Sequence, residues 1–295
     1  MLATHGRGII IIDDISPLRE INEESLSEKL YFFDNDKYIM SDQSGFSDNF
    51  GRETQFFGSN SSLNAQIKYL LPKRHTFGKM TMEIVDESGE SIVKLSPGKS
   101  KGMNFVSWNY RMSQPKVAKG KTLARGGLIS PRVKEGTYNV VITKGRDVFS
   151  KSINVISDPN TDLDATEKML KYDTTMKLYN LSEELAYIVY TIDEILASDK
   201  FKKGIKNKLQ TLKESLVITT GDNYVGTAEN ELREDLLDLY SKLASSYDKP
   251  SRNDLDNLGI VEDEYYNLKS EYDKIIKRVD LSQIELLSKS DFIKK

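Results

Sequence analysis

Hydrophobic and polar residues alternate through residues 64–157, a pattern typical of β-strands. Six segments show it most clearly, and they are residues 65–71, 79–86, 91–96, 103–111, 136–144 and 149–157. Gly-containing turns separate two pairs of them, at 86–90 and 144–147. Short strands with a turn about every ten residues predict an antiparallel β-sandwich of immunoglobulin (Ig) type. Trp108 is the only Trp, and we expect it to be a buried core residue with Tyr138 packed nearby.

The hydrophobic period changes after Asp158 and Pro159 to steps of three and four residues, which is typical of helices. The first such seam consists of Leu178, Leu181, Leu185, Ile188, Ile192 and Ile195. Further seams follow in 201–216, 232–243 and 258–279, and a loop at 221–226 and Pro250 interrupt them. Short seams joined by loops predict an antiparallel bundle of three or four helices over 158–295, which we expect to fold on its own. An intermolecular coiled coil is the alternative.

The first 63 residues are less regular. Ile9–Ile12 is a short apolar run that predicts a strand, with no earlier strand to pair with. We expect it to pair within residues 1–35, with the second apolar run at Leu30–Phe33. Residues 36–63 are rich in Asp, Asn, Ser and Gly and predict a linker. Aromatic side chains anchor this linker at intervals, namely Phe46, Phe50, Phe56 and Phe57.

Composition is that of a globular chain of 295 residues, long enough for two domains. The formal net charge is −3, but residues 1–157 hold 22 basic and 17 acidic side chains, and the remainder holds 20 and 28. The absence of cysteine excludes disulfides, thiol catalysis and Cys-ligated zinc. The sequence has no apolar stretch long enough to span a bilayer, and no signal-peptide pattern at its start.

Candidate catalytic and metal-binding residues are few. The two histidines, His5 and His75, are far apart in sequence, so they nominate no metal site, and we expect no cofactor. The stretch 5–8 is a weak match to an anion-binding nest, because no helix follows it. Asp13 and Asp14 are adjacent carboxylates, but neighbours on a strand point to opposite faces, which favours strand termination over paired catalysis.

A basic stretch is the strongest candidate for a binding site. Seven cationic residues occur with no acid before Glu135, and they are Arg111, Lys116, Lys119, Lys121, Arg125, Arg132 and Lys134. Gly and Pro make this stretch a loop. It could contact a polyanion such as an acidic glycan or lipopolysaccharide phosphate. The interpretation we favour is a solvated loop, which could dock on the acidic helical half. Nucleic acid is disfavoured, because aromatic residues are not interleaved beyond Tyr110.

Several motifs together resemble a known family. LATHGRGIIIIDDISPL, at residues 2–18, is similar to the terminal strand of the last blade in bacterial β-propellers of the sortilin/BNR-repeat type, which are often catalogued as glycosyl hydrolases or sialidase-like proteins. GMNFVSWNYR, ISPRVKEGTYNVVIT and VISDPN resemble strands of that family's Ig-like domain, which is similar to that of flagellar hook-capping proteins. A helical C-terminal region follows in that family. The resemblance covers the whole chain, but the Asp-box repeats of the propeller do not occur.

The resemblance implies a C-terminal fragment of a larger, Bacteroidota-type exported protein. Residues 1–35 would be a propeller-blade remnant, 36–63 a linker, 64–157 the Ig-like sandwich and 158–295 the helical bundle. The expected function is a non-catalytic accessory or interaction region for spacing, assembly or ligand adhesion. The alternative is a fragment of a glycan-acting hydrolase whose active site lies in the propeller. The parent is expected in the periplasm, at the outer membrane or outside the cell. Its propeller domain is the expected partner, with an acidic glycan or a protein as a further candidate.

Overall fold

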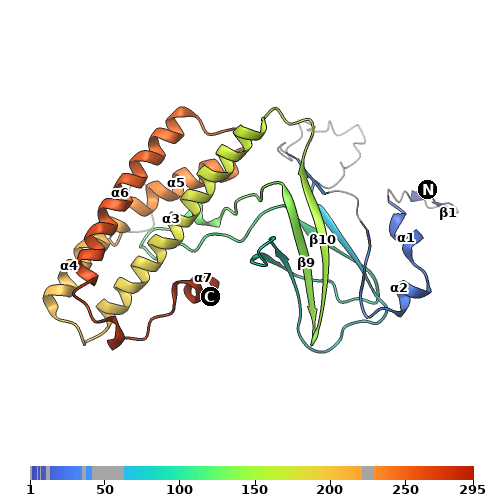
Figure 1. Cartoon of the computed structure of the whole chain (residues 1–295), viewed down its shortest axis with the longest axis horizontal. Coiled ribbons are helices and arrows are strands. Elements are labelled where there is room, and N and C mark those ends of the chain that lie inside the picture. The colour runs from blue at the N-terminus through green and yellow to red at the C-terminus, as the bar shows by residue number, and fades with distance from the viewer. Residues whose placement is uncertain are drawn as a thin grey trace. The chain divides into compact units, whose positions relative to one another are not determined.

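A computed structural model describes residues 2–4, 6, 8–10, 14–34, 38–41, 63–220 and 229–295. The chain divides into two compact units. Unit 1 comprises Met1–Arg111 and Lys134–Thr161, and unit 2 comprises Met112–Val133 and Asp162–Lys295. Unit 1 contains the strands and unit 2 the long helices, as Figure 1 shows. The expected mixture of β and α structure is therefore confirmed.

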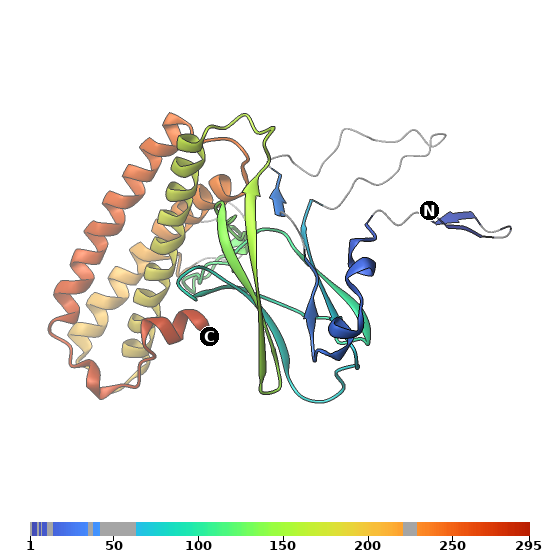
Figure 2. The ribbon, with the colours of Figure 1, turned by 45° about the vertical axis from the view of Figure 1, so that its right-hand side comes forward.

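All six strands predicted from the alternating pattern are present in unit 1. They are β5 (Ala65–Leu71), β6 (Met80–Val85), β7 (Ser91–Leu95), β8 (Gly102–Trp108), β9 (Gly136–Lys144) and β10 (Asp147–Ser157). A five-stranded sheet has the order β4-β10-β9-β6-β7, and a three-stranded sheet has the order β3-β5-β8. Their pairs are antiparallel except β4–β10. The long β9–β10 hairpin is visible in Figure 2.

Trp108 is a core residue of unit 1, as predicted, with 1% of its surface exposed. Its ring centroid lies 5.9 Å from that of Tyr138 on β9, so this pair joins the two sheets. The indole Nε1 donates a hydrogen bond of 2.9 Å to the carbonyl of Arg111. β8 ends at Trp108 rather than Arg111, because Tyr110 has a φ of 56° and leaves the extended conformation.

The N-terminal expectation was wrong in two respects. β1 (Leu2–Thr4) precedes β2 (Gly8–Ile10) and pairs with it, through a turn in which Gly6 has a φ of 73°. The second apolar run does not pair with β2. Its strand β3 (Tyr31–Phe32) joins β5, with Tyr31 opposite Leu70. Leu30 and Phe33 beside it are both buried. In the sheet of β3, β5 and β8, these apolar side chains lose more water-exposed surface than they would in a two-stranded hairpin with β2.

Two short helices and, besides β3, one further strand lie between β2 and β5 in the described residues. They are α1 (Ser16–Glu20), α2 (Glu23–Ser27) and β4 (Tyr38–Met40). β4 pairs in parallel with the end of β10, so three residues of the predicted linker belong to a sheet. The four phenylalanines predicted to anchor the linker lie outside the described residues. Asp14 accepts a hydrogen bond of 2.9 Å from the backbone N–H of Ser16, the first residue of α1.

The four helical seams of unit 2 form helices at the predicted positions. They are α3 (Ala165–Ala197), α4 (Lys203–Leu216), α5 (Leu232–Ser245) and α6 (Arg252–Ile276), and a short α7 (Lys289–Lys294) follows. The first seam is buried along its whole length and shares one core with the other three helices. Asp164 and Ser251 form capping boxes at the starts of α3 and α6, which satisfy their first backbone N–H groups. The predicted loop at 221–226 lies outside the described residues.

Residues 112–133 differ from the expected domain boundaries, because they belong to unit 2 although strands of unit 1 flank them. The chain therefore passes between the units at three places in sequence, after Arg111, after Val133 and after Thr161. The helical unit therefore includes a segment that lies outside 158–295 in sequence. That residues from 158 onwards fold on their own stays a prediction.

Candidate functional site

The inserted segment, residues 112–133, contains most of the predicted basic site. Its two ends are joined by a hydrogen bond of 2.9 Å from the N–H of Met112 to the carbonyl of Pro131. Ala118 is buried in the core of the helices, and Val117, Ala124 and Ile129 pack against that core. The segment is therefore a packed part of unit 2 rather than a free loop.

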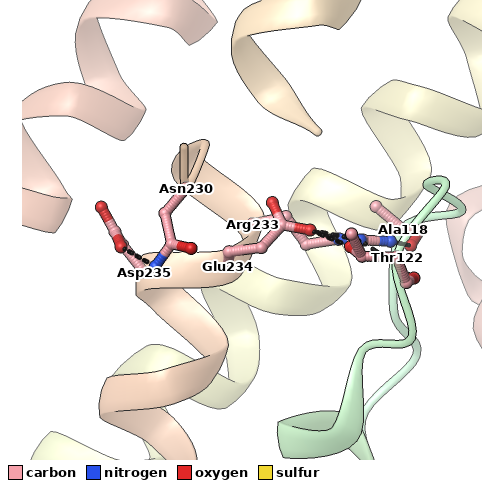
Figure 3. A network of polar contacts seen from close by, with 6 residues as sticks. All are labelled: Ala118, Thr122, Asn230, Arg233, Glu234 and Asp235. Atoms are coloured by element: carbon pink, nitrogen blue, oxygen red, sulfur yellow. Dashed lines mark hydrogen bonds and ion pairs between the residues drawn. The ribbon is translucent and has the colours of Figure 1, made fainter. Parts of the chain in front are cut away.

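Arg233 on α5 holds the inserted segment at its centre. The side chain is 2% exposed, and its Nη1 donates to the carbonyl of Ala118 at 2.9 Å. Its Nη2 donates to the carbonyl and the hydroxyl of Thr122 at 3.2 and 2.5 Å, and pairs with Glu234. The Thr122 hydroxyl in turn donates to Glu234 Oε1 at 2.7 Å. Figure 3 shows Arg233 reaching from α5 into this part of the segment.

A buried cation is costly unless hydrogen bonds and a counter-ion compensate for lost hydration. Here two backbone carbonyls, one hydroxyl and one carboxylate supply that compensation to Arg233. The arrangement specifies how the segment lies on α5, because the carbonyls of residues 118 and 122 must both face the guanidinium. Glu234 Oε2 is buried without a hydrogen-bond partner.

Two glycines permit close approach between the segment and α5. A Cβ on Gly126 would lie 2.9 Å from the carbonyl carbon of Leu237, closer than real Cβ atoms come to backbone. A Cβ on Gly120 would meet the Arg233 guanidinium. Near Gly126, the Tyr240 hydroxyl donates to the carbonyl of Ile129 at 2.7 Å. These contacts explain the glycines in the segment by packing.

The seven predicted cationic residues are divided between the two units. Arg111 and Lys134 lie in unit 1, and the other five lie in unit 2. Lys116 Nζ lies 5.1 Å from the ring centroid of Phe292, and the Arg132 guanidinium lies at the same distance from the ring of Tyr247. Such cation–π contacts are favourable and position both side chains on aromatic rings. The three exposed cations of the segment are Lys119, Lys121 and Arg125.

α5 provides an acidic surface in unit 2. Burial and the neighbouring carboxylates raise the pKa of Glu231 and of Asp238 above their ordinary values. Glu234 and Asp235 on α5 contribute to both shifts, so their carboxylates lie near Glu231 and Asp238. A cationic segment on the same unit has the complementary sign.

A pocket of about 380 Å³ lies where the segment meets α3 and the C-terminal residues. Tyr187 and Tyr190 of α3 hold that C-terminal part, because the Tyr187 hydroxyl donates to the carbonyl of Leu287 at 3.0 Å and the Tyr190 hydroxyl accepts from its N–H at 3.2 Å. Phe292 stacks on Tyr190 with 4.7 Å between ring centroids. Charged groups of both signs line the pocket, including Lys116, Lys119, Asp193 and Glu194.

Sequence reasoning missed Arg233 and Tyr240, although a signal for them exists. The predicted seam of α5 runs through 232, 236, 239 and 243, but residues 233, 237, 240 and 244 form a second buried stripe beside it. Leu237, Tyr240 and Ala244 on this stripe are apolar or aromatic. A second stripe at helical spacing predicts that another part of the chain covers the helix. Arg233 lies on the same stripe, four residues before Leu237.

The other candidate motifs from the sequence lie partly outside the described residues. Within the described residues, no group of three or more His, Asp or Glu side chains is placed to hold a metal ion. His5, Arg7 and Asp13 lie outside the described residues, so the nest motif and the Asp13–Asp14 pair are not placed. In the described part of the chain, no helix combines the length and apolarity that crossing a membrane requires.

Comparison of the chain with protein-family models, with curated proteins and with solved structures gave no match.

Proposed function

We propose that the chain is a non-catalytic accessory region of an exported bacterial β-propeller protein. In this proposal an Ig-like β-sandwich and an antiparallel helical bundle serve spacing, assembly or ligand adhesion. The observation that carries it is that the chain passes between the two units at three places in sequence, two of them at the ends of the inserted segment. Domains joined by one linker move independently by default. In this proposal the three connections limit that motion. A spacer between functional parts requires this restriction.

Two features of unit 1 support the Ig-like assignment. Trp108 is buried on β8, as the Trp of Ig domains is buried in its sandwich core. The Tyr138 hydroxyl donates a hydrogen bond of 2.9 Å to the carbonyl of Lys134, four residues upstream. A tyrosine that bonds to upstream backbone in this way is the tyrosine corner of Ig-type sandwiches. The two antiparallel-rich sheets are compatible with this architecture.

The motif GMNFVSWNYR, which carries part of the family resemblance, serves structure in this chain. Gly102 has a φ of 95°, a conformation that favours glycine. Asn104 is buried, and its side chain bonds to the backbone of Ser100 and Gly102. The Trp108 indole bonds to backbone as well. The residues that define the resemblance thus stabilise a sheet, which favours an accessory role over chemistry.

The spacing role is tested by measuring the distance between the units. The chain lacks cysteine, so Ser150→Cys on β10 and Asn257→Cys on α6 introduce two exposed labelling sites without background. We expect a single narrow distance distribution by pulsed electron paramagnetic resonance. A broad distribution would contradict the spacing role. Release of sugars from acidic or neutral glycans by the purified chain would contradict the non-catalytic assignment.

A further inference from the structure

Helices α4 and α6 form an open groove of about 830 Å³ on unit 2. The α4 wall runs from Lys202 to Ser215, and the α6 wall from Glu271 to Arg278. At about 1.5 Å of rise per residue, the α4 wall is about 20 Å long. This length fits three to four turns of another helix, at about 5.4 Å per turn.

The floor of the groove is apolar. Ile205, Leu212 and Ile275 line it, and Leu212 is 4% exposed whereas the two isoleucines are only half-buried. The seam of α3, by contrast, is fully buried. The helical core of unit 2 is therefore open along this groove, and covering it would remove apolar surface from water.

Cationic side chains line both walls. Lys202 and Lys208 come from the α4 side, Lys274 comes from α6, and Arg278 lies just after the C-terminal end of α6. All four are exposed, and in the described part of the chain none has an ion-pair partner. The groove contains one acid, Glu271. Other α4 lysines are engaged, since Lys206 Nζ donates to the carbonyl of Leu196 at 3.0 Å and Lys213 pairs with Asp193 at 2.5 Å.

We infer that this groove binds an acidic amphipathic helix of a partner protein. Such a helix places apolar side chains on the floor and carboxylates against the cations of both walls, as in helix-in-groove recognition. Gly204, Thr211 and Ser215 line the groove with small side chains, which let the partner's backbone come close. A polyanion without an apolar face would leave the floor exposed. The inference deepens the proposed interaction role, because it names the chemistry of the partner.

The test is a binding titration of the full chain by fluorescence anisotropy. The probe is a labelled 16-residue helical peptide, with Leu on one face and Glu on the other, and its scrambled isomer is the comparison. Lys208→Glu with Lys274→Glu reverses two charges in the groove. Lys203→Glu with Lys277→Glu is the matched control, because these exposed lysines lie on the same helices outside the groove lining. Thr211→Trp obstructs the groove without changing its charge.

We expect saturable, salt-sensitive binding of the amphipathic peptide and at least about tenfold weaker binding of the scrambled one. Charge reversal and Thr211→Trp should each weaken binding at least about tenfold, and the control pair should change it less than about threefold. Equal binding of both peptides, or no binding, overturns the inference. If the groove variants weaken the binding of heparin and leave the binding of the peptide unchanged, the inference is overturned in favour of a polyanion site.

A concentration-dependent dimer that the groove variants abolish would overturn the inference in favour of a second copy of the chain. The distance measurement between Ser150→Cys and Asn257→Cys uses sites outside the groove lining. A narrow distribution with no peptide binding therefore refutes the groove partner alone, and a broad distribution with peptide binding refutes the spacing role alone.

Discussion

Gly120 lies against the guanidinium of Arg233, so closely that a Cβ on Gly120 would come within 2.5 Å of Arg233 Cζ. The arginine cannot move aside freely, because it is buried and hydrogen-bonded to Ala118 and Thr122. One backbone position of the inserted segment is thus fixed by one side chain of α5. This relationship couples the packing of the segment to that of α5.

Gly120→Ala should therefore destabilise the chain through Arg233. We expect a loss of about 1–3 kcal/mol in denaturant unfolding, the usual range for overpacking. Arg233→Met should itself cost about 3–5 kcal/mol, because it removes a buried, compensated cation and leaves Glu234 without it. In the Arg233→Met background, Gly120→Ala should cost markedly less. Equal costs in both backgrounds would show that the two residues are not coupled.

Gly126→Ala and Gly259→Ala form a matched pair, because we expect the first to lower the free energy of unfolding and the second to raise it. The first places a Cβ against backbone of α5, which cannot rotate away, so it should cost at least about 1–3 kcal/mol. The second lies within α6 with open space around it, and Ala is a better helix former, so it should stabilise by about 1 kcal/mol. Thermal unfolding of the two variants measures both. A neutral Gly126→Ala would contradict the close approach.

Trp108→Ala should cost about 3–5 kcal/mol, the usual penalty for emptying a large aromatic site. The expectation follows from the burial of Trp108 and its contact with Tyr138. Trp108→Phe keeps part of the apolar volume and should cost less. A loss below about 1 kcal/mol for the alanine variant, in denaturant unfolding, would show that Trp108 does not hold the sheets together.

Asp254 should make the chain sensitive to acid. Hydrogen bonds from Lys242 and Ser251 hold the pKa of this buried carboxyl below its ordinary value of 3.8. Because the pKa of Asp254 is lower in the folded chain than in the unfolded chain, the ionised carboxylate stabilises the fold. This stabilisation is complete well above pH 3.8, the ordinary pKa. It is lost as the pH falls from there through the pKa of the folded state. Asp254→Asn should lower the melting temperature at neutral pH and flatten its decline in acid.

The matched control for that titration is Asp256→Asn, an exposed carboxyl on the same helix. It should leave the melting temperature and its acid dependence nearly unchanged. If the melting temperature of Asp254→Asn falls as steeply in acid as that of the wild type, carboxyls other than Asp254 cause the acid sensitivity.

The elements of this chain were predictable because their hydrophobic periods are local. Six strands followed from alternation in 64–157, and four helices followed from steps of three and four after Pro159. The positions of the first strands were not predictable in the same way. Tyr31 and Phe32 pair with residues almost 40 positions away, and no local pattern shows which sheet edge an apolar run will join.

The inserted segment was predictable as a loop and as a cationic stretch, and its docking on the helical half was one of the two interpretations. The contacts that hold it there were not predictable. Its docking depends on a buried arginine in α5, and single sequences present arginine as a surface residue by default. The second buried stripe of α5, at Leu237, Tyr240 and Ala244, was the readable sign that something covers that face. The α4–α6 groove was not predictable, because it depends on how two helices separate.

Amide hydrogen exchange across residues 112–133 of the full chain tests most directly whether the segment is part of the helical unit. The N–H of Lys121 donates to the carbonyl of Ile218 at 2.7 Å, so we expect it to exchange as slowly as the amides of α5. Arg233→Met should speed exchange across the segment and leave the strands of unit 1 unchanged. Exchange of the wild-type segment at the rate of an unstructured peptide would contradict this account.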